Sequence, residues 1–338
     1  MELFQLSRAD SVREAIAAGA TSSGAHDAAH DGAQVRFLAG GTTLLDLMKL
    51  NVERPGRVID ISRLPLDQIE ATPDGGVKIG ATVRNADLAV HPLVSERYAV
   101  LSQALLSGAS AQLRNMATTG GNLLQRTRCV YFRDTAMPCN KRSPGTGCSA
   151  IGGFNRMMAI LGVSDACIAS NPSDLNVALT ALGATIHIEG TKGPRSVAID
   201  AFFLLPGTTP QRETVVEAGD LITHVTLPPL PEGSRSFYLK LRDRASYEFA
   251  LASAAVVVKV SDGRVAHARV ALGGVGTKPW HSTEAEAVLN GAVPDATTFA
   301  RAAEAALADA RPQSQNGFKV ELARRCLVHA LTQATRND

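Results

Sequence analysis

The stretch Leu38-Ala39-Gly40-Gly41-Thr42-Thr43-Leu44-Leu45-Asp46 indicates the fold most clearly. It follows a predicted strand at 35–38 and opens a predicted helix at 44–50. A strand, a glycine pair and a helix in this order leave several backbone N–H groups pointing one way, and the helix dipole favours an anion there. Glycine lacks the Cβ atom that would keep a diphosphate away. Alone, the stretch fits either a phosphate-binding loop or an ordinary tight turn.

A second glycine loop repeats this chemistry. Thr118-Thr119-Gly120-Gly121-Asn122 combines two glycines, hydroxyl groups and an amide within five residues. Two such loops in one domain would hold one diphosphate from both sides, so the pair favours phosphate binding. No G-x-G-x-x-G follows a predicted strand, and the patterns G-x-x-x-x-G-K-[ST], G-x-S-x-G and H-E-x-x-H do not occur.

Regular patterns surround the two loops. The chain begins with a predicted strand at 3–6 and a helix at 11–18, with Ser11 as the expected N-cap. His26 and His30 lie four positions apart in the next segment, which is predicted to be a solvated loop. Further strands are expected at 58–61, 76–79, 185–188 and 222–227, and helices at 93–106 and 174–182.

The pattern changes after the proline-rich stretch 228–233, which is the best candidate for a domain boundary. Strands are predicted at 237–241, 251–260 and 265–272, followed by helices at 283–289, 297–310 and 318–334. Cys326 lies beside an apolar stripe of the last helix, so it is predicted to be a core residue.

Composition limits the class of protein. The chain has 338 residues, of which 45% are hydrophobic and 20% charged, so it is long enough for about two domains with substantial cores. A net charge of +2 gives no reason to expect nucleic-acid binding. The longest apolar stretch, 249–258, is about half of what a membrane span needs, so no span is expected. The N-terminus lacks the pattern of an export signal.

Four of the five cysteines, Cys129, Cys139, Cys148 and Cys167, fall within one segment. An odd number in a chain of this length, without an export signal, argues against a disulfide framework. The intervals contain no Cys-x2-Cys pair of the kind that structural zinc sites usually have, and four thiolates suit an iron–sulfur cluster. A [4Fe–4S] cluster is favoured, with [2Fe–2S], zinc and free thiols as alternatives. The segment is basic, which would stabilise an anionic cluster or bind a partner subunit; its cations are Arg126, Arg128, Arg133, Lys141, Arg142 and Arg156.

Three separated stretches together resemble a known family. They are 38–50 (LAGGTTLLDLMKL), 111–122 (AQLRNMATTGGN) and 173–176 (SDLN), and they are similar to the flavin-binding subunit of the xanthine dehydrogenase family of molybdenum hydroxylases. The resemblance implies an α+β fold. A two-lobed FAD-binding domain of the vanillyl-alcohol-oxidase/PCMH type would span 1–229, with lobes of about 1–56 and 57–229. A C-terminal domain at 234–338 would consist of a three-stranded antiparallel sheet and three helices.

The resemblance also implies that the two glycine loops hold the diphosphate of FAD. Asp174 matches an aspartate that contacts the ribityl region, Ile222 an apolar residue near the isoalloxazine ring, and Lys240 a lysine close to that ring. Strand packing for Ile222 and a solvated surface charge for Lys240 are the alternatives. No side chain is expected to act as a catalytic acid or base. The expected FAD-binding residues are Leu38, Ala39, Gly40, Gly41, Thr42, Thr43, Leu44, Leu45, Thr118, Gly120, Gly121, Asn122, Asp174, Ile222 and Lys240.

The chain departs from the common family pattern between Asn122 and Asp174, which are 52 positions apart here and much closer in most members. The extra segment, about 123–171, contains all four clustered cysteines and is expected to be an added cofactor site. Such an insertion is similar to two branches of the family: the flavin subunits of the three-subunit periplasmic aldehyde oxidoreductase and of 4-hydroxybenzoyl-CoA reductase. The stretches Tyr131-Phe132-Arg133 and Cys139-Asn140-Lys141 look closer to the aldehyde branch.

We therefore expect the electron-transfer subunit of a molybdenum-dependent aldehyde oxidoreductase, which carries one FAD and one [4Fe–4S] cluster, the cluster bound by the four cysteines. The implied partners are a large molybdenum-cofactor subunit, a small subunit with two [2Fe–2S] clusters, and an external electron acceptor. A reductase of the benzoyl-CoA type, a flavoprotein with a structural zinc ion, and a binding protein without redox chemistry are the alternatives. Co-export to the periplasm with a signal-bearing partner is the expected location, and the cytoplasm is the alternative.

Overall fold

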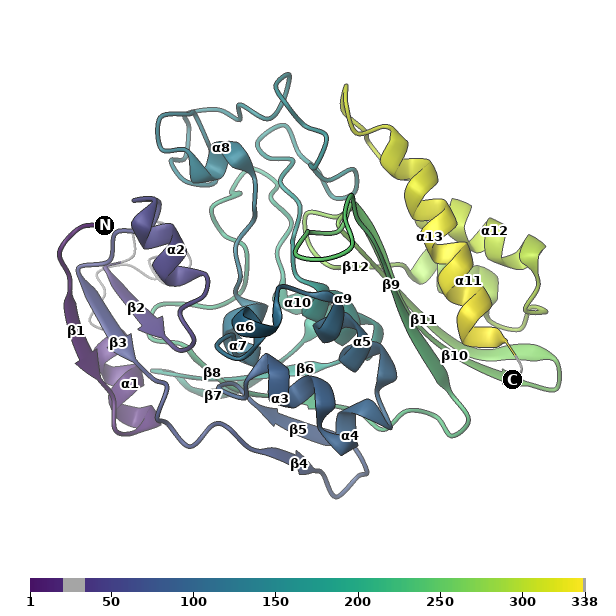
Figure 1. Ribbon diagram of the computed structural model, residues 1–338, viewed down its shortest axis with the longest axis horizontal. Helices are drawn as coiled ribbons and strands as arrows, with labels where there is room; N and C mark the ends of the chain where they lie inside the picture. Colours follow the sequence, from purple (N-terminus) through teal and green to yellow (C-terminus); the bar gives the residue numbers. More distant parts are fainter. Residues whose placement is uncertain (21–33, 337–338) are drawn as a thin grey trace.

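Three β-sheets with helices packed against them make up the computed structural model, which describes residues 1–20 and 34–336 (Figure 1). The first sheet is parallel and three-stranded, in the order β1-β3-β2. Helix α1 begins after Ser11, whose side chain accepts a hydrogen bond from the Glu14 N–H, so the predicted N-cap is confirmed. His26 and His30 lie outside the described residues. The elements of this part are β1 (Gln5–Arg8), α1 (Val12–Gly19), β2 (Val35–Leu38), α2 (Leu44–Lys49) and β3 (Arg57–Asp60).

The second sheet is antiparallel and five-stranded, in the order β4-β5-β8-β6-β7. Along β6 the side chains of Ile186 and Ile188 are buried and their neighbours are less so, which is the period-two pattern of a strand with one face on the core. The strands are β4 (Ile69–Ala71), β5 (Val77–Gly80), β6 (Thr185–Gly190), β7 (Gly193–Ala198) and β8 (Leu221–Leu227).

Short helices cover the buried face of this sheet. The prediction of a single helix at 93–106 is wrong, because the chain forms two helices separated just before Tyr98. The ring of Tyr98 is buried there, and its hydroxyl donates a hydrogen bond to the Pro228 carbonyl. The helices of this region are α3 (Asn85–Val90), α4 (Pro92–Ser95), α5 (Ala99–Ser107), α6 (Ala111–Arg114), α7 (Thr119–Leu123), α9 (Asp174–Ala181) and α10 (Ile199–Phe202).

The third sheet lies C-terminal to the segment 228–234, in the order β12-β11-β10-β9. It has one strand more than expected, because the two residues of β12 add to its edge. The apolar run of β10 is buried on both faces: Ala255 and Val257 pack toward α5 and α9, and Val256 and Val258 pack toward α13. The elements are β9 (Arg235–Leu241), β10 (Ala252–Ser261), β11 (Arg264–Gly273), β12 (Trp280–His281), α11 (Thr283–Leu289), α12 (Ala296–Ala306) and α13 (Phe318–Thr335).

The cysteine-bearing insertion forms a separate lobe of turns at the top of Figure 1. Its one helix is α8 (Val130–Arg133), and a small hydrophobic cluster that includes Phe132 and the cysteines forms its interior. Cys326 on α13 is buried in the C-terminal core, as predicted. Within the described parts of the chain, no helix is long and apolar enough to cross a membrane.

Candidate functional site

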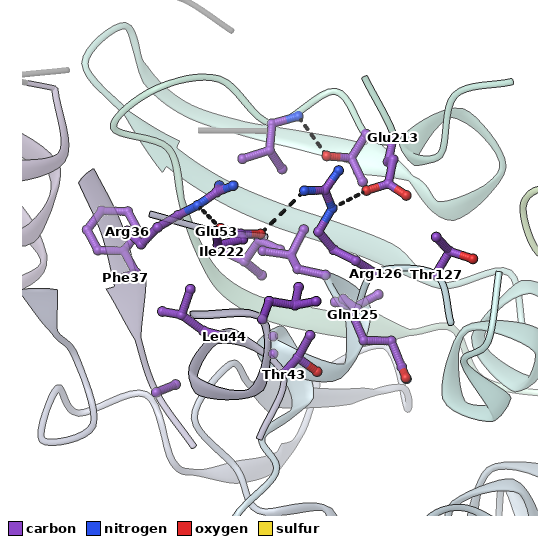
Figure 2. Close-up of a pocket in the computed structure, with 18 of the residues that line it drawn as sticks. Arg36, Phe37, Thr43, Leu44, Glu53, Gln125, Arg126, Thr127, Glu213 and Ile222 are labelled. Carbon is purple, nitrogen blue, oxygen red and sulfur yellow. Dashed lines mark hydrogen bonds and ion pairs between the residues drawn. The ribbon is translucent and has the colours of Figure 1, made fainter. Parts of the chain in front are cut away.

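A large cavity lies between the first and second sheets, and both glycine loops line it (Figure 2). We call it the loop cavity. The first loop contributes residues 38–44, the second contributes Thr118, Gly120 and Gly121, and Ile222 comes from β8. All the expected FAD-binding residues line this cavity except Leu45, Asn122, Asp174 and Lys240.

The two loops touch through their backbones. A Cβ atom at Gly40 would lie 1.9 Å from the Met116 carbonyl oxygen, so only glycine fits this approach. The second loop is anchored by the Gly120 N–H, which donates to the Ala81 carbonyl at 2.8 Å. Gly41 has φ +73°, a conformation that side-chain-bearing residues rarely adopt. The glycines therefore let the two segments pack backbone against backbone in the wall of the loop cavity.

Asn122 and Asp174 hold neighbouring elements together. The Asn122 side-chain oxygen accepts a hydrogen bond at 2.8 Å from Ser173, which in turn caps α9. Asp174 forms an ion pair with Lys240 at 2.8 Å and accepts a hydrogen bond from the Tyr238 hydroxyl. Both side chains of this ion pair are buried where α9 meets β9, so the alternative of a solvated surface charge at Lys240 is wrong. Their contact with a flavin stays a prediction.

Charged residues that the sequence analysis did not assign to the flavin site also line the loop cavity. Arg36, Glu53, Arg126 and Glu213 are joined in series, as Figure 2 shows, with N···O distances of 2.6, 3.4 and 2.7 Å. Lys141 extends the series, with its Nζ 3.0 Å from Glu213. We call these five residues the buried ion chain. No local motif marks Glu53 or Glu213, because the partners of each come from distant parts of the sequence.

Burial and charge act against each other in the buried ion chain. Burial raises the pKa of Glu213, but Lys141 and Arg126 more than offset this and hold the pKa at about 2. Glu213 is therefore ionised at neutral pH and binds two cations that belong to the insertion.

The four clustered cysteines line a second, smaller cavity inside the insertion, which we call the cysteine cavity. Three of them are buried and Cys148 is partly exposed. Burial raises the pKa of Cys129 to about 12 and also raises that of Cys167, so thiolates here need a bound cation. Among the residues that the structure describes, no three His, Cys, Asp or Glu side chains are grouped to hold a metal ion. The cysteines thus surround a common space without forming a preassembled site for one ion.

Four arginines of the insertion form contacts within the chain. Arg128 and Arg133 both form ion pairs with Asp46, at 3.0 and 2.8 Å, and Arg156 pairs with Asp243 at 2.7 Å. Arg142 donates to the carbonyls of Tyr131, Phe132 and Met137. These contacts fasten the insertion to itself and to both flanking domains. Stabilisation of a cluster or binding of a partner by the same cations stays a prediction.

Comparison with known proteins agrees with this architecture. Residues 3–230 match the family model of the FAD binding domain in molybdopterin dehydrogenase, and residues 236–334 match that of the CO dehydrogenase flavoprotein C-terminal domain. The chain is 52% identical over 301 residues to the aldehyde oxidoreductase FAD-binding subunit PaoB of Escherichia coli, covering 88% of this chain and 91% of that protein. It is 30% identical to the glyceraldehyde dehydrogenase medium chain of Sulfolobus acidocaldarius, covering 74% and 72%.

A solved structure shares the fold over nearly the whole chain. Carbon monoxide dehydrogenase from Hydrogenophaga pseudoflava superposes with a TM-score of 0.76 at 28% identity, covering 98% of this chain and 97% of that one. The fold and the loop cavity thus define an FAD-binding flavoprotein subunit. The chain belongs to the family of FAD-binding medium subunits of molybdenum hydroxylases.

Proposed function

We propose that this chain is the electron-transfer subunit of a molybdenum-dependent aldehyde oxidoreductase and carries a [4Fe–4S] cluster beside its FAD. The observation that carries this proposal is the convergence of Cys129, Cys139, Cys148 and Cys167 on one cavity that borders the loop cavity. The 52% identity to an aldehyde oxidoreductase FAD-binding subunit supports the substrate class.

The donor set fits an iron–sulfur cluster better than a single zinc ion. The ligands of a [4Fe–4S] cluster bind four separate iron atoms, so their sulfur atoms surround a larger space than the four ligands of one zinc. Four thiols around one cavity supply the number of ligands that a [4Fe–4S] cluster takes, and their intervals lack the Cys-x2-Cys pair that structural zinc sites usually have. When bound, FAD and the cluster supply the one- and two-electron redox chemistry of the subunit.

In this proposal, the residues of this chain bind FAD and orient it. We assign the FAD diphosphate to the junction of the two glycine loops, where the first loop would supply backbone N–H groups and the hydroxyls of Thr42 and Thr43. In the second loop the N–H groups of Gly120 and Gly121 already donate to the Ala81 carbonyl and the Thr118 hydroxyl, so this loop would contribute mainly its close backbone approach. Ile222 offers an apolar wall to the loop cavity. Asp174 and Lys240 are proposed to contact the flavin from the junction of α9 and β9.

The proposed partners are a large molybdenum-cofactor subunit, where the aldehyde and water become a carboxylic acid, and a small subunit with two [2Fe–2S] clusters. Electrons would leave this chain to an external acceptor. Export to the periplasm together with a signal-bearing partner is proposed on the family resemblance alone.

Metal, sulfide and flavin content of the purified chain tests the proposal. About four iron, four acid-labile sulfide and one FAD per chain are expected. Cys139→Ser should lose most of the iron and sulfide, whereas Cys326→Ala, which removes a cysteine from the C-terminal core, should keep both. One zinc without sulfide would refute the cluster and leave a flavoprotein with a structural metal. Full iron content in Cys139→Ser would refute the assignment of that ligand.

A further inference from the structure

The loop cavity and the cysteine cavity share part of their walls. Lys141, Cys167 and Ala169 line both cavities. Lys141 lies in the turn between Cys139 and Cys148. The backbones of these two cysteines form an isolated antiparallel β-bridge. Two of the four cysteines therefore define the geometry of the loop that carries Lys141.

The buried ion chain runs from this shared wall across the loop cavity. Lys141 contacts Glu213 and donates to the Pro210 carbonyl at 2.8 Å, so its amino group is held at two points. Glu213 contacts Arg126, and Arg126 contacts Glu53, which also lines the loop cavity. The side chains of Lys141, Arg126 and Glu53 are each less than a tenth exposed to solvent.

A second contact joins the same two cavities. The Arg126 guanidinium lies over the ring of Phe132, 4.6 Å from its centroid, and Phe132 lines the cysteine cavity. Movement of the turn that carries Lys141 would therefore act on Arg126 through Glu213, and movement of Phe132 would act on it directly. Because buried charges interact strongly and an unpaired one is costly, loss of one member of the series forces the others to rearrange.

We propose that the buried ion chain couples the two cavities, so that filling the cysteine cavity strengthens FAD binding and FAD binding strengthens retention of the metal. The inference rests on the proposed function, since it requires iron in the cysteine cavity. A group bound to Cys139 and Cys148 would hold the intervening turn more firmly than the hydrogen bonds of the turn alone, and its loss lets Lys141 leave Glu213 more often. Arg126 and Glu53 then change position in the wall of the loop cavity. Linkage requires the same coupling factor in both directions.

The test measures the FAD dissociation constant of the full-length chain, by quenching of flavin fluorescence, in iron-loaded and chelator-stripped protein. The wild-type chain is expected to bind FAD about tenfold more tightly when iron is present. In Lys141→Met the two dissociation constants should become nearly equal. Lys192→Met is the matched control, because Lys192 pairs with Glu217 on the surface, outside both cavities, and it should keep the full ratio.

A double variant covers the case in which Lys141→Met fails to fold. Lys141→Met combined with Glu213→Gln removes both charges and leaves Arg126 paired with Glu53, and it should also abolish the ratio. Absence of iron from the wild-type chain would overturn the proposed function. Iron present, with equal FAD dissociation constants in the loaded and stripped wild type, would overturn the coupling alone. A wild-type ratio that persists in the Lys141 variants would overturn the role of the buried ion chain.

Discussion

The backbone of Gly40 lies against the backbone of Met116, and this contact sets how closely the two glycine loops approach each other. No side chain can be added at this position without moving one of the loops, because the nearest atom is a main-chain oxygen rather than a flexible side chain. Next to this contact, Gly41 adopts a positive φ, and the Gly120 N–H anchors the second loop to the Ala81 carbonyl.

Replacement of Gly40 by alanine should therefore separate the loops. We expect Gly40→Ala to lower FAD affinity by more than about tenfold and to destabilise the flavin-free chain by about 2 kcal/mol. Flavin titration and urea unfolding measure the two effects. Gly317→Ala is the control, because a Cβ atom there would meet no atom within 4 Å. Unchanged FAD affinity in Gly40→Ala would mean that the gap between the loops is not the diphosphate site.

Single residues differ in how much their sequence context reveals. The neighbouring residues in the sequence predicted that Gly40 binds phosphate, and the loop that contains Gly40 lines the loop cavity. Lys240 had no such context, and only the fold shows that it is buried against Asp174. Glu53 was not singled out at all, since its partners Arg36 and Arg126 lie 17 and 73 positions away.

At the level of elements, His281 of β12 connects the C-terminal sheet with α10, the helix that follows β7 of the second sheet. Its Nδ1 lies 3.2 Å from Asp200 of α10, and its Nε2 lies 2.7 Å from Glu286 of α11. Hydrogen bonds to Asp200 and Glu286 raise the pKa of His281 to about 9. At neutral pH a charged imidazole therefore bridges three elements.

This bridge makes a pH-dependent contribution to stability. Because the pKa of His281 is higher in the folded chain than the usual 6.5, the contribution is complete below pH 6.5 and is lost as the pH rises through about 9. We expect His281→Gln to be less stable than the wild type by about 2 kcal/mol at pH 6.5, after allowance for solvent screening, and nearly equal to it above pH 9.

The difference in unfolding free energy between His281→Gln and the wild type cancels the contributions of other groups that titrate in both proteins. Burial lowers the pKa of Lys319 to about 7, so its effect on stability runs the opposite way, increasing from about pH 7 upward. Since Lys319 is present in both proteins, the difference in urea unfolding free energy isolates His281. A difference that is constant over this pH range would contradict the bridge.

In the whole molecule, the C-terminal part of the cysteine-bearing insertion is hydrogen-bonded to the C-terminal domain. Buried Asn316 donates to the carbonyls of Met158 and Ala159, at 3.2 and 3.3 Å, and buried Lys319 donates to Met157 at 3.1 Å. The Ala159 N–H then donates to the carbonyl of Ile168, the residue after Cys167. One arm of the cysteine cavity is thus held by a domain that lies about 150 residues further along the chain.

Loss of this support should expose Cys167. In the metal-free chain, Asn316→Ala leaves two buried carbonyls without a donor, so local opening should become easier by about 1–2 kcal/mol. Alkylation of Cys167 by N-ethylmaleimide, followed by mass spectrometry, should accelerate about tenfold. Asn290→Ala, at the exposed end of α11, should leave the rate unchanged. An unchanged rate in Asn316→Ala would show that the C-terminal domain does not position this cysteine.

The sequence by itself determined the features that depend on neighbours in the chain: the two glycine loops, the alternation of strands, the apolar β10 and the grouping of four cysteines. Such features follow from backbone geometry and local burial, which a short stretch encodes. Only the tertiary structure decided which charges neutralise each other and which cavities share a wall. Glu213 lies 87 positions from Arg126 in the sequence, so its pairing with Arg126 and Lys141 depends on how the insertion packs in the fold. The sequence therefore predicted a basic segment for a cluster or a partner, and only the fold shows that these cations also pair with Asp46, Glu213 and Asp243.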